Sequence, residues 1–102
     1  MKHRESMLTL TNKANQRIDN VLEAYGIDRE EMNVEKADGY VSECRWVCCY
    51  VCLDLGVPLA HVRRMMFYKQ GVSVEYAINR VKELMNLDED FKDRVDVLST
   101  DH

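Results

Sequence analysis

Residues that interrupt helices are scarce in this chain of 102 residues, which has one proline and four glycines. The chain also lacks a run of alternating apolar and polar residues bounded by turn signals on both sides, which is the pattern of a half-buried strand. No sheet is therefore expected. With 46% hydrophobic residues, the chain can build one core, and we predict an all-α fold: a compact bundle of about five helices.

A long uninterrupted apolar segment is missing as well. The most apolar stretch, WVCCYVCLDLGVPLA, is broken by Asp54 and by Gly56-Val57-Pro58, whereas a transmembrane helix needs about 20 apolar residues. The polar start, MKHRESMLTLTNK, has neither an apolar signal-peptide core nor a small-residue cleavage site. We expect no membrane contact and a cytoplasmic location.

Widely spaced cysteines, which a disulfide framework needs, are absent: all four lie within nine residues, at Cys44, Cys48, Cys49 and Cys52. On one helix three of them share a face, and Cys49 lies about 100° around the axis. A tetrahedral metal site would therefore need a ligand from another element, and the three histidines are scattered. We expect free, buried cysteines and no metal or cofactor; a zinc or redox site is the less favoured alternative.

Apolar residues at three- and four-residue steps predict the helices, and capping residues predict where they end. Residues 1–11 lack this periodicity and are predicted to be a flexible arm, residues 12–98 a single domain, and residues 99–102 a tail. Gly26 and Gly56 are expected to end two helices. Asp28 with Glu31 forms a capping-box pattern for a short helix. Further helix starts are expected at Pro58, Ser73 and Asp88.

The expected core consists of the apolar stripes of these helices. Its members are Ala14, Ile18, Val21, Leu22 and Tyr25; Tyr40, Val41, Cys44, Val47, Cys48, Val51, Cys52 and Leu55; Leu59, Val62 and Met66; Val74, Ala77, Ile78, Val81, Leu84 and Met85; and Phe91, Val95 and Leu98. The stripe from Tyr40 to Leu55 is the longest, so it predicts the central helix. No nucleophile or acid–base constellation stands out. We therefore expect no enzymatic activity and no small-molecule substrate.

Charge is unevenly distributed along the chain, whose net charge is −4. Residues 60–83 hold five basic and two acidic residues, whereas residues 84–102 hold two basic and six acidic ones. A local basic patch is what contact with phosphates requires, whatever the net charge. The competing interpretation is an ordinary solvated helix face.

The order of the elements, together with the stretches RIDNVLEAYGIDREEM, ECRWVCCYVC, VPLAHVRRMMF and VEYAINRV, resembles the C-terminal DNA-binding domain of the bacterial replication initiator DnaA. The resemblance covers about Asn15 to Asp96 and implies a Trp-repressor-like helix-turn-helix whose second helix enters the major groove. It implies double-stranded DNA as partner. Together with the local basic patch, it leads us to expect phosphate contacts from Arg45, Arg63, Arg64, Lys69, Ser73 and Arg80. Gln70 and Asn79 are the candidates for contact with base edges.

This sequence departs from the family at the residues that read DNA. The family's Arg-Asp-His-Thr-Thr signature corresponds here to Lys69 through Ser73, with Gly71 at the base-reading histidine. Gly71 either serves a strained turn or marks a lost reading residue. The stretch NVEKADGY, which corresponds to the family's basic loop, has one lysine and two acids, and Trp46 replaces a glutamine. These changes predict weak or altered sequence specificity.

Two further features of the sequence bear on function: one concerns ATPase activity, and the other favours an alternative to DNA binding. The chain has no G-x-x-x-x-G-K-[ST] phosphate loop, so the resemblance does not extend to the initiator's ATPase activity. Net acidity and the missing reading residues favour a protein-interaction adaptor that keeps the fold and binds a replication protein or a second copy of the chain. Trp46, Met65 and Phe67 could belong either to the core or to such an interface.

Overall fold

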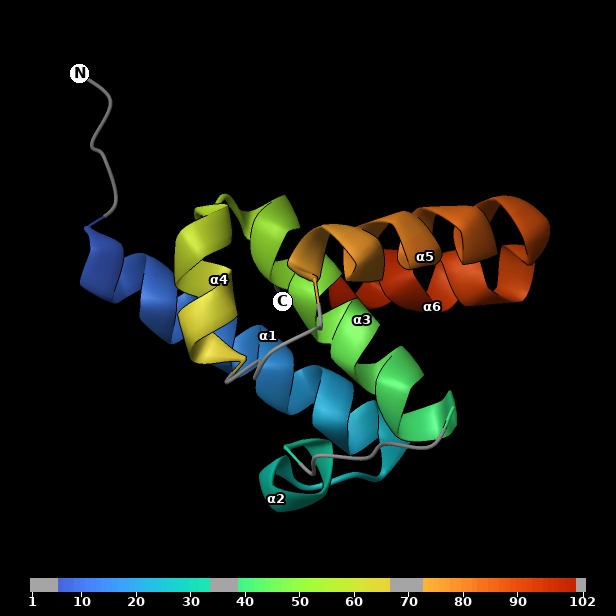
Figure 1. Cartoon of the computed structure of the whole chain (residues 1–102), viewed down its shortest axis with the longest axis horizontal. Helices are drawn as coiled ribbons and strands as arrows, with labels where there is room; N and C mark the ends of the chain where they lie inside the picture. Colours follow the sequence, from blue (N-terminus) through green and yellow to red (C-terminus); the bar gives the residue numbers. More distant parts are fainter. Residues whose placement is uncertain (1–5, 34–38, 67–72, 101–102) are drawn as a thin grey trace.

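The structure is a computed structural model that describes residues 6–33, 39–66 and 73–100. These residues form six helices (Figure 1), which are α1 (Met7–Tyr25), α2 (Arg29–Met32), α3 (Gly39–Leu55), α4 (Leu59–Met65), α5 (Val74–Leu87) and α6 (Glu89–Leu98). The described residues contain no strand, which confirms the all-α prediction. The turn expected around Gly71 lies outside them, so the helix-turn-helix stays a prediction.

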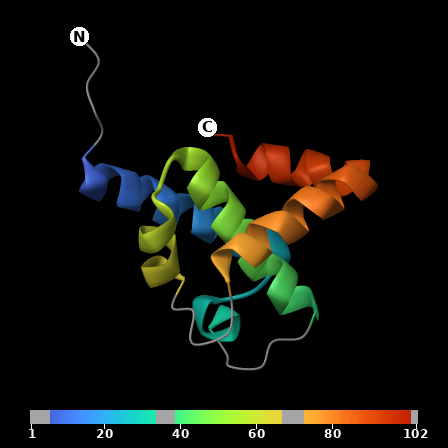
Figure 2. The same cartoon turned by 45° about the horizontal axis from the view of Figure 1, so that its top comes forward.

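Helix α3 is the centre of the fold, as the sequence predicts. It contacts each of the other five helices, and Figure 2 shows α5 crossing it, with α6 joined to the far end of α5. Its side chains Cys44, Val47, Cys48, Cys49, Val51 and Cys52 are fully buried. The prediction of buried cysteines is confirmed, and all four are free. Cys49, outside the apolar stripe, is buried because helices pack on more than one face of α3.

Helices α1 and α3 end in the same way. Gly26 and Gly56 have φ values of 67° and 104°, a left-handed region that glycine adopts without a steric penalty. Just beyond, the backbone N–H of Ile27 donates to the carbonyl of Leu22 at 3.0 Å, and Val57 makes the matching bond at the end of α3. Ile27 and Val57, the residues that follow the two glycines, are buried. These are Schellman motifs closed by a hydrophobic contact.

The predicted helix starts are confirmed at three caps. Asp28 accepts from the N–H of Glu31 at 2.8 Å, and the Glu31 carboxylate accepts from the N–H of Asp28, which completes the capping box of α2. The Ser73 hydroxyl accepts from the N–H of Tyr76. Asp88 ends α5 and caps α6. Such caps satisfy backbone N–H groups that have no partner within their helix.

The prediction of an arm was wrong for residues 7–11, because α1 already begins at Met7. Ser6 caps it by accepting from the N–H of Thr9 at 3.0 Å. Thr11 Oγ1 lies 2.9 Å from Nε2 of His61 on α4. The first turns therefore gain a tertiary contact that hydrophobic periodicity cannot reveal.

Two side chains depart from the predicted pattern of burial. Tyr40, placed in the core stripe by its spacing, is 53% exposed, and its hydroxyl donates to the carbonyl of Tyr25 at 2.6 Å. Arg17 is only 6% exposed. Its Nη1 donates to the carbonyl of Val51 at 3.2 Å and lies 3.4 Å from Asp54 Oδ2. A charged group can be buried here because the backbone and a carboxylate compensate it.

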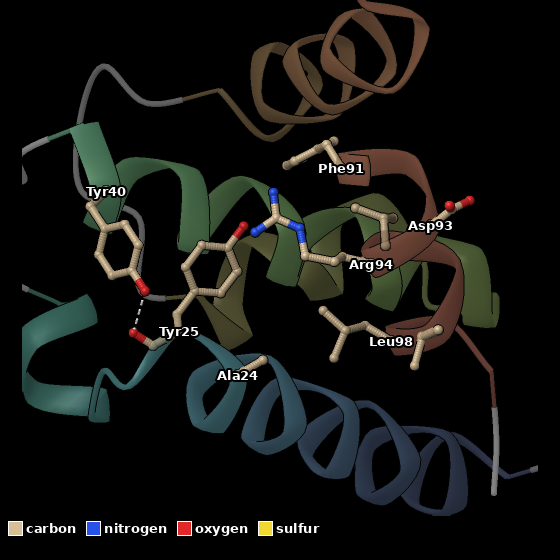
Figure 3. A pocket seen from close by; sticks show the side chains of 9 residues that line it. Ala24, Tyr25, Tyr40, Phe91, Asp93, Arg94 and Leu98 are labelled. Atoms are coloured by element: carbon tan, nitrogen blue, oxygen red, sulfur yellow. Dashed lines mark hydrogen bonds between the residues drawn. The ribbon is translucent and has the colours of Figure 1, made fainter. Parts of the chain in front are cut away.

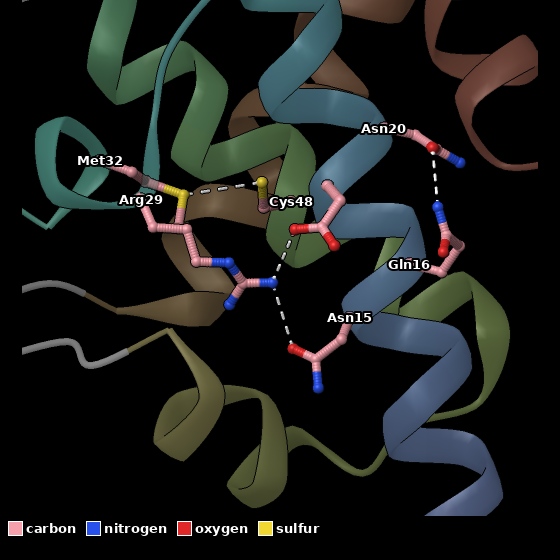
Figure 4. A network of polar contacts seen from close by, with 7 residues as sticks. Asn15, Gln16, Asn20, Arg29, Met32 and Cys48 are labelled. Atoms are coloured by element: carbon pink, nitrogen blue, oxygen red, sulfur yellow. Dashed lines mark hydrogen bonds and ion pairs between the residues drawn. The ribbon is translucent and has the colours of Figure 1, made fainter.

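The short helix α2 is held by polar contacts to α1 and a sulfur contact to α3 (Figure 4). Arg29 Nη2 donates to Asn15 Oδ1 at 3.3 Å and pairs with Asp19 Oδ1 at 3.0 Å. The Cys48 thiol donates to the Met32 sulfur at 3.8 Å. A helix of four residues is not stable alone, so these contacts determine its place.

Candidate nucleic-acid interface

Helix α5, the predicted DNA-contacting helix, is buried along one side only. Its stripe packs on α3 and includes the fully buried Val74, Ala77 and Val81. The opposite side of the helix is exposed and carries Glu75, Tyr76, Asn79, Lys82 and Glu83. One side of α5 is therefore available to a partner over most of its length.

Helix α4 contacts the start of this helix and carries two exposed arginines. Arg63 Nη2 pairs with Glu75 Oε1 at 3.0 Å, and both side chains are more than half exposed. Arg64 is also exposed. An exposed ion pair of this kind contributes only about 0–1 kcal/mol. The pair thus orients Arg63 towards α5 without making it inaccessible to another anion.

Arg80 lies where α5 meets α3. Its Nη1 pairs with Glu83 Oε2 at 2.7 Å, and its guanidinium carbon is 5.2 Å from the centre of the Trp46 ring. The ring of Tyr76 meets that of Trp46 edge-on, with centroids 6.1 Å apart. Trp46 is partly buried against the core, and Tyr76 and Arg80 of α5 pack against its ring. Met65 is likewise partly buried against the core.

The remaining predicted site residues have different surroundings. Arg45 donates from Nε to the carbonyl of Met32, so it has a structural partner at the end of α2. Ser73 caps α5, and Asn79 is exposed on that helix. Lys69, Gln70 and also Phe67 lie outside the described residues. The structure thus brings Arg63, Arg64, Ser73, Asn79 and Arg80 onto two contacting helices.

Two residues at this surface were not singled out from the sequence. Glu75 neutralises Arg63, and Tyr76 exposes 54% of its surface beside Trp46. The sequence does contain a signal for Tyr76: it directly precedes the buried Ala77, so it lies about 100° away from the apolar stripe. Glu75 carries no such signal, because its partner lies on another helix.

We expect Ser73→Ala to lower the free energy of unfolding by about 1 kcal/mol, because the N–H of Tyr76 loses its acceptor. Urea denaturation followed by circular dichroism measures this change. Ser73→Asp is the matched control, since aspartate restores the acceptor and should retain most of the stability. Equal losses for the two variants would contradict a capping role for Ser73.

The charges of the described helices keep the asymmetry seen in the sequence. Helices α4 and α5 carry four basic and two acidic residues, whereas α6 carries two basic and four acidic ones. Within the described ranges, no three histidine, cysteine or acidic side chains are grouped as a metal site. None of the described helices combines the length and apolarity needed to cross a bilayer.

The basic excess of this surface therefore comes from Arg63 and Arg64 of α4, since α5 carries two basic and two acidic residues. Comparison with protein-family models, with curated proteins and with solved structures found no match to this chain.

Proposed function

We propose that this chain is a small DNA-binding module that contacts the phosphates of double-stranded DNA through α4 and α5, with weak or altered sequence specificity. One observation supports this most: α5 leaves a long side exposed, and the basic side chains of α4 adjoin its first turn through the Arg63–Glu75 pair. The module has no ATPase activity in this proposal. A cytoplasmic location belongs to the same proposal.

The existing ion pairs are compatible with phosphate binding. Arg63 and Arg80 each pair with a carboxylate, but both pairs are at least one-third exposed. Breaking such a pair costs little, whereas a guanidinium–phosphate contact is charge-assisted and releases condensed counterions. Binding would then exchange Glu75 and Glu83 for phosphate oxygens.

The residues have separate roles in this proposal. Arg63, Arg64 and Arg80 hold phosphates and fix the orientation of the module. Asn79, exposed on α5, can present its amide to a base edge. Lys69 and Gln70 take part only as the DnaA resemblance implies. Arg45 supports α2 first, because its Nε already has the Met32 carbonyl as a partner.

A salt titration of binding to random duplex DNA tests the proposal. We expect log K to fall linearly with log salt, and the double variant Arg63→Gln, Arg64→Gln to reduce that slope by about 2, since each phosphate contact contributes about 0.9. Lys92→Gln is the matched control, because it removes one exposed charge on α6 and should leave the slope unchanged. Absence of binding at low salt, or affinity insensitive to salt, rejects the proposal.

A protein-interaction adaptor is the second candidate function, and one observation favours it. Tyr76 is 54% exposed and rests on Trp46, and exposed aromatic residues are typical of protein interfaces. The partner would be a replication protein or a second copy of this chain. If DNA binding is absent while Tyr76→Ser abolishes self-association measured by analytical ultracentrifugation, the adaptor function replaces the first proposal.

A further inference from the structure

An apolar pocket opens between α1, the start of α3 and α6, away from the exposed side of α5 (Figure 3). Its volume is about 350 Å³, within the range of small-molecule sites. Aromatic and aliphatic side chains make its walls: Ala24, Tyr25, Tyr40, Phe91, Val95 and Leu98. The size therefore suits one ring or a short alkyl chain rather than a folded partner.

The tyrosine hydroxyls of this pocket are already engaged. Tyr25 donates to Glu43 Oε2 at 2.6 Å, and Tyr40 donates to the Tyr25 carbonyl at 2.6 Å. Burial, together with the hydrogen bond to Glu43, raises the pKa of Tyr25 well above its ordinary value, so it stays protonated. The two rings are 5.2 Å apart. They contribute their faces and edges to the pocket.

Arg94 is the cationic group of the pocket. Its guanidinium extends across the pocket towards the Tyr25 hydroxyl (Figure 3), and its carbon is 5.8 Å from the centre of the Phe91 ring. Among the described residues it makes no hydrogen bond or ion pair. Asp93, the acidic residue of the lining, points away from the other side chains. An arginine with five N–H donors therefore faces an apolar pocket without an anionic partner.

We infer that this pocket binds a small organic carboxylate, with its apolar ring or chain between Tyr25, Phe91 and Leu98 and its carboxylate on Arg94. An apolar wall with one convergent charged group is the usual composition of a ligand site. A planar guanidinium can hold a carboxylate with two parallel hydrogen bonds. The inference does not depend on DNA binding, because neither α4 nor α5 lines the pocket.

The main opposing charge is Glu43, whose carboxylate accepts the Tyr25 hydroxyl. Arg94, by contrast, crosses the pocket itself. If Glu43 dominated the electrostatic potential in the pocket, an organic cation would bind in place of an anion. The charge of the preferred ligand therefore shows whether Arg94 or Glu43 dominates.

Isothermal titration calorimetry with three probes of one shape tests the inference: 4-phenylbutanoate, the neutral 4-phenylbutanamide and the cationic 4-phenylbutylamine. We expect the carboxylate to bind up to about fivefold more tightly than the amide, because Arg94 is exposed and water weakens its pairing with an anion. Arg94→Gln should remove this preference. Lys92→Gln, on the same helix, should not.

A second variant separates loss of the pocket from loss of the charge. Ala24→Leu places a larger side chain at the pocket wall, at an exposed position of α1. It should weaken the binding of all three probes, while the melting temperature stays close to that of the original chain. Binding of the amine in preference to the carboxylate overturns the inference. It is likewise overturned if no probe binds, or if Arg94→Gln binds the carboxylate as tightly as before.

Discussion

Ile18→Ala is expected to lower the free energy of unfolding by about 3 kcal/mol, the middle of the range for removing a large aliphatic side chain from a core. Ile18 has 0% exposure on α1, which packs directly against α3. Small domains are stable by only about 5–15 kcal/mol. The variant should therefore lose a large share of its stability.

Urea denaturation followed by circular dichroism measures this loss. Leu8→Ala is the matched control, because Leu8 lies on the same helix and is 71% exposed; we expect a change within about 0.5 kcal/mol. Similar losses for the two variants would mean that α1 is not anchored through its Ile18 face.

Arg17→Ala should lower the free energy of unfolding by about 2 kcal/mol, because the Val51 carbonyl loses a buried donor and the core loses the aliphatic part of the side chain. The ion pair with Asp54 explains little of this cost. Asp54 is 46% exposed, and water therefore screens the pair. Asp54→Asn should accordingly cost less than about 1 kcal/mol.

A double-mutant cycle of Arg17→Ala and Asp54→Asn, measured by urea denaturation, separates the two contributions. We expect a coupling energy below about 1 kcal/mol. A coupling energy close to the whole cost of Arg17→Ala would show that the ion pair, and not the bond to the Val51 carbonyl, accounts for the burial of Arg17.

The sequence predicts helix ends better than it predicts the helix start at Met7 or the exposure of Tyr40. Gly26 and Asp28 act on their immediate neighbours through the backbone, so their effect is readable locally. Tyr40 is different, because its position depends on the carbonyl of Tyr25 on another helix. Burial of Arg17 depends likewise on Val51, which is 34 residues away in sequence.

The features of the candidate interface likewise divide into those that the sequence predicts and those that depend on contacts between helices. The exposure of Asn79 follows from the helical period of α5, so the sequence alone predicts it. The pairing of Arg63 with Glu75 and the packing of Arg80 on Trp46 depend on the way three helices cross. Periodicity carries no information on such crossings. The pocket at Arg94 was not predicted for this reason, since its walls come from α1, α3 and α6.

The four cysteines clustered in one core helix affect how well the protein refolds after unfolding. In the native state all four cysteines are buried, and burial raises the pKa of Cys52 to about 12, so its reactive thiolate is scarce. An unfolded chain exposes four thiols within nine residues, close enough to oxidise to one another. A disulfide between any two of them would be incompatible with the native packing of α3, in which all four thiols are free. We therefore expect recovery after heating to depend on a reductant, because air oxidation of the unfolded chain would trap it in disulfide-bonded forms.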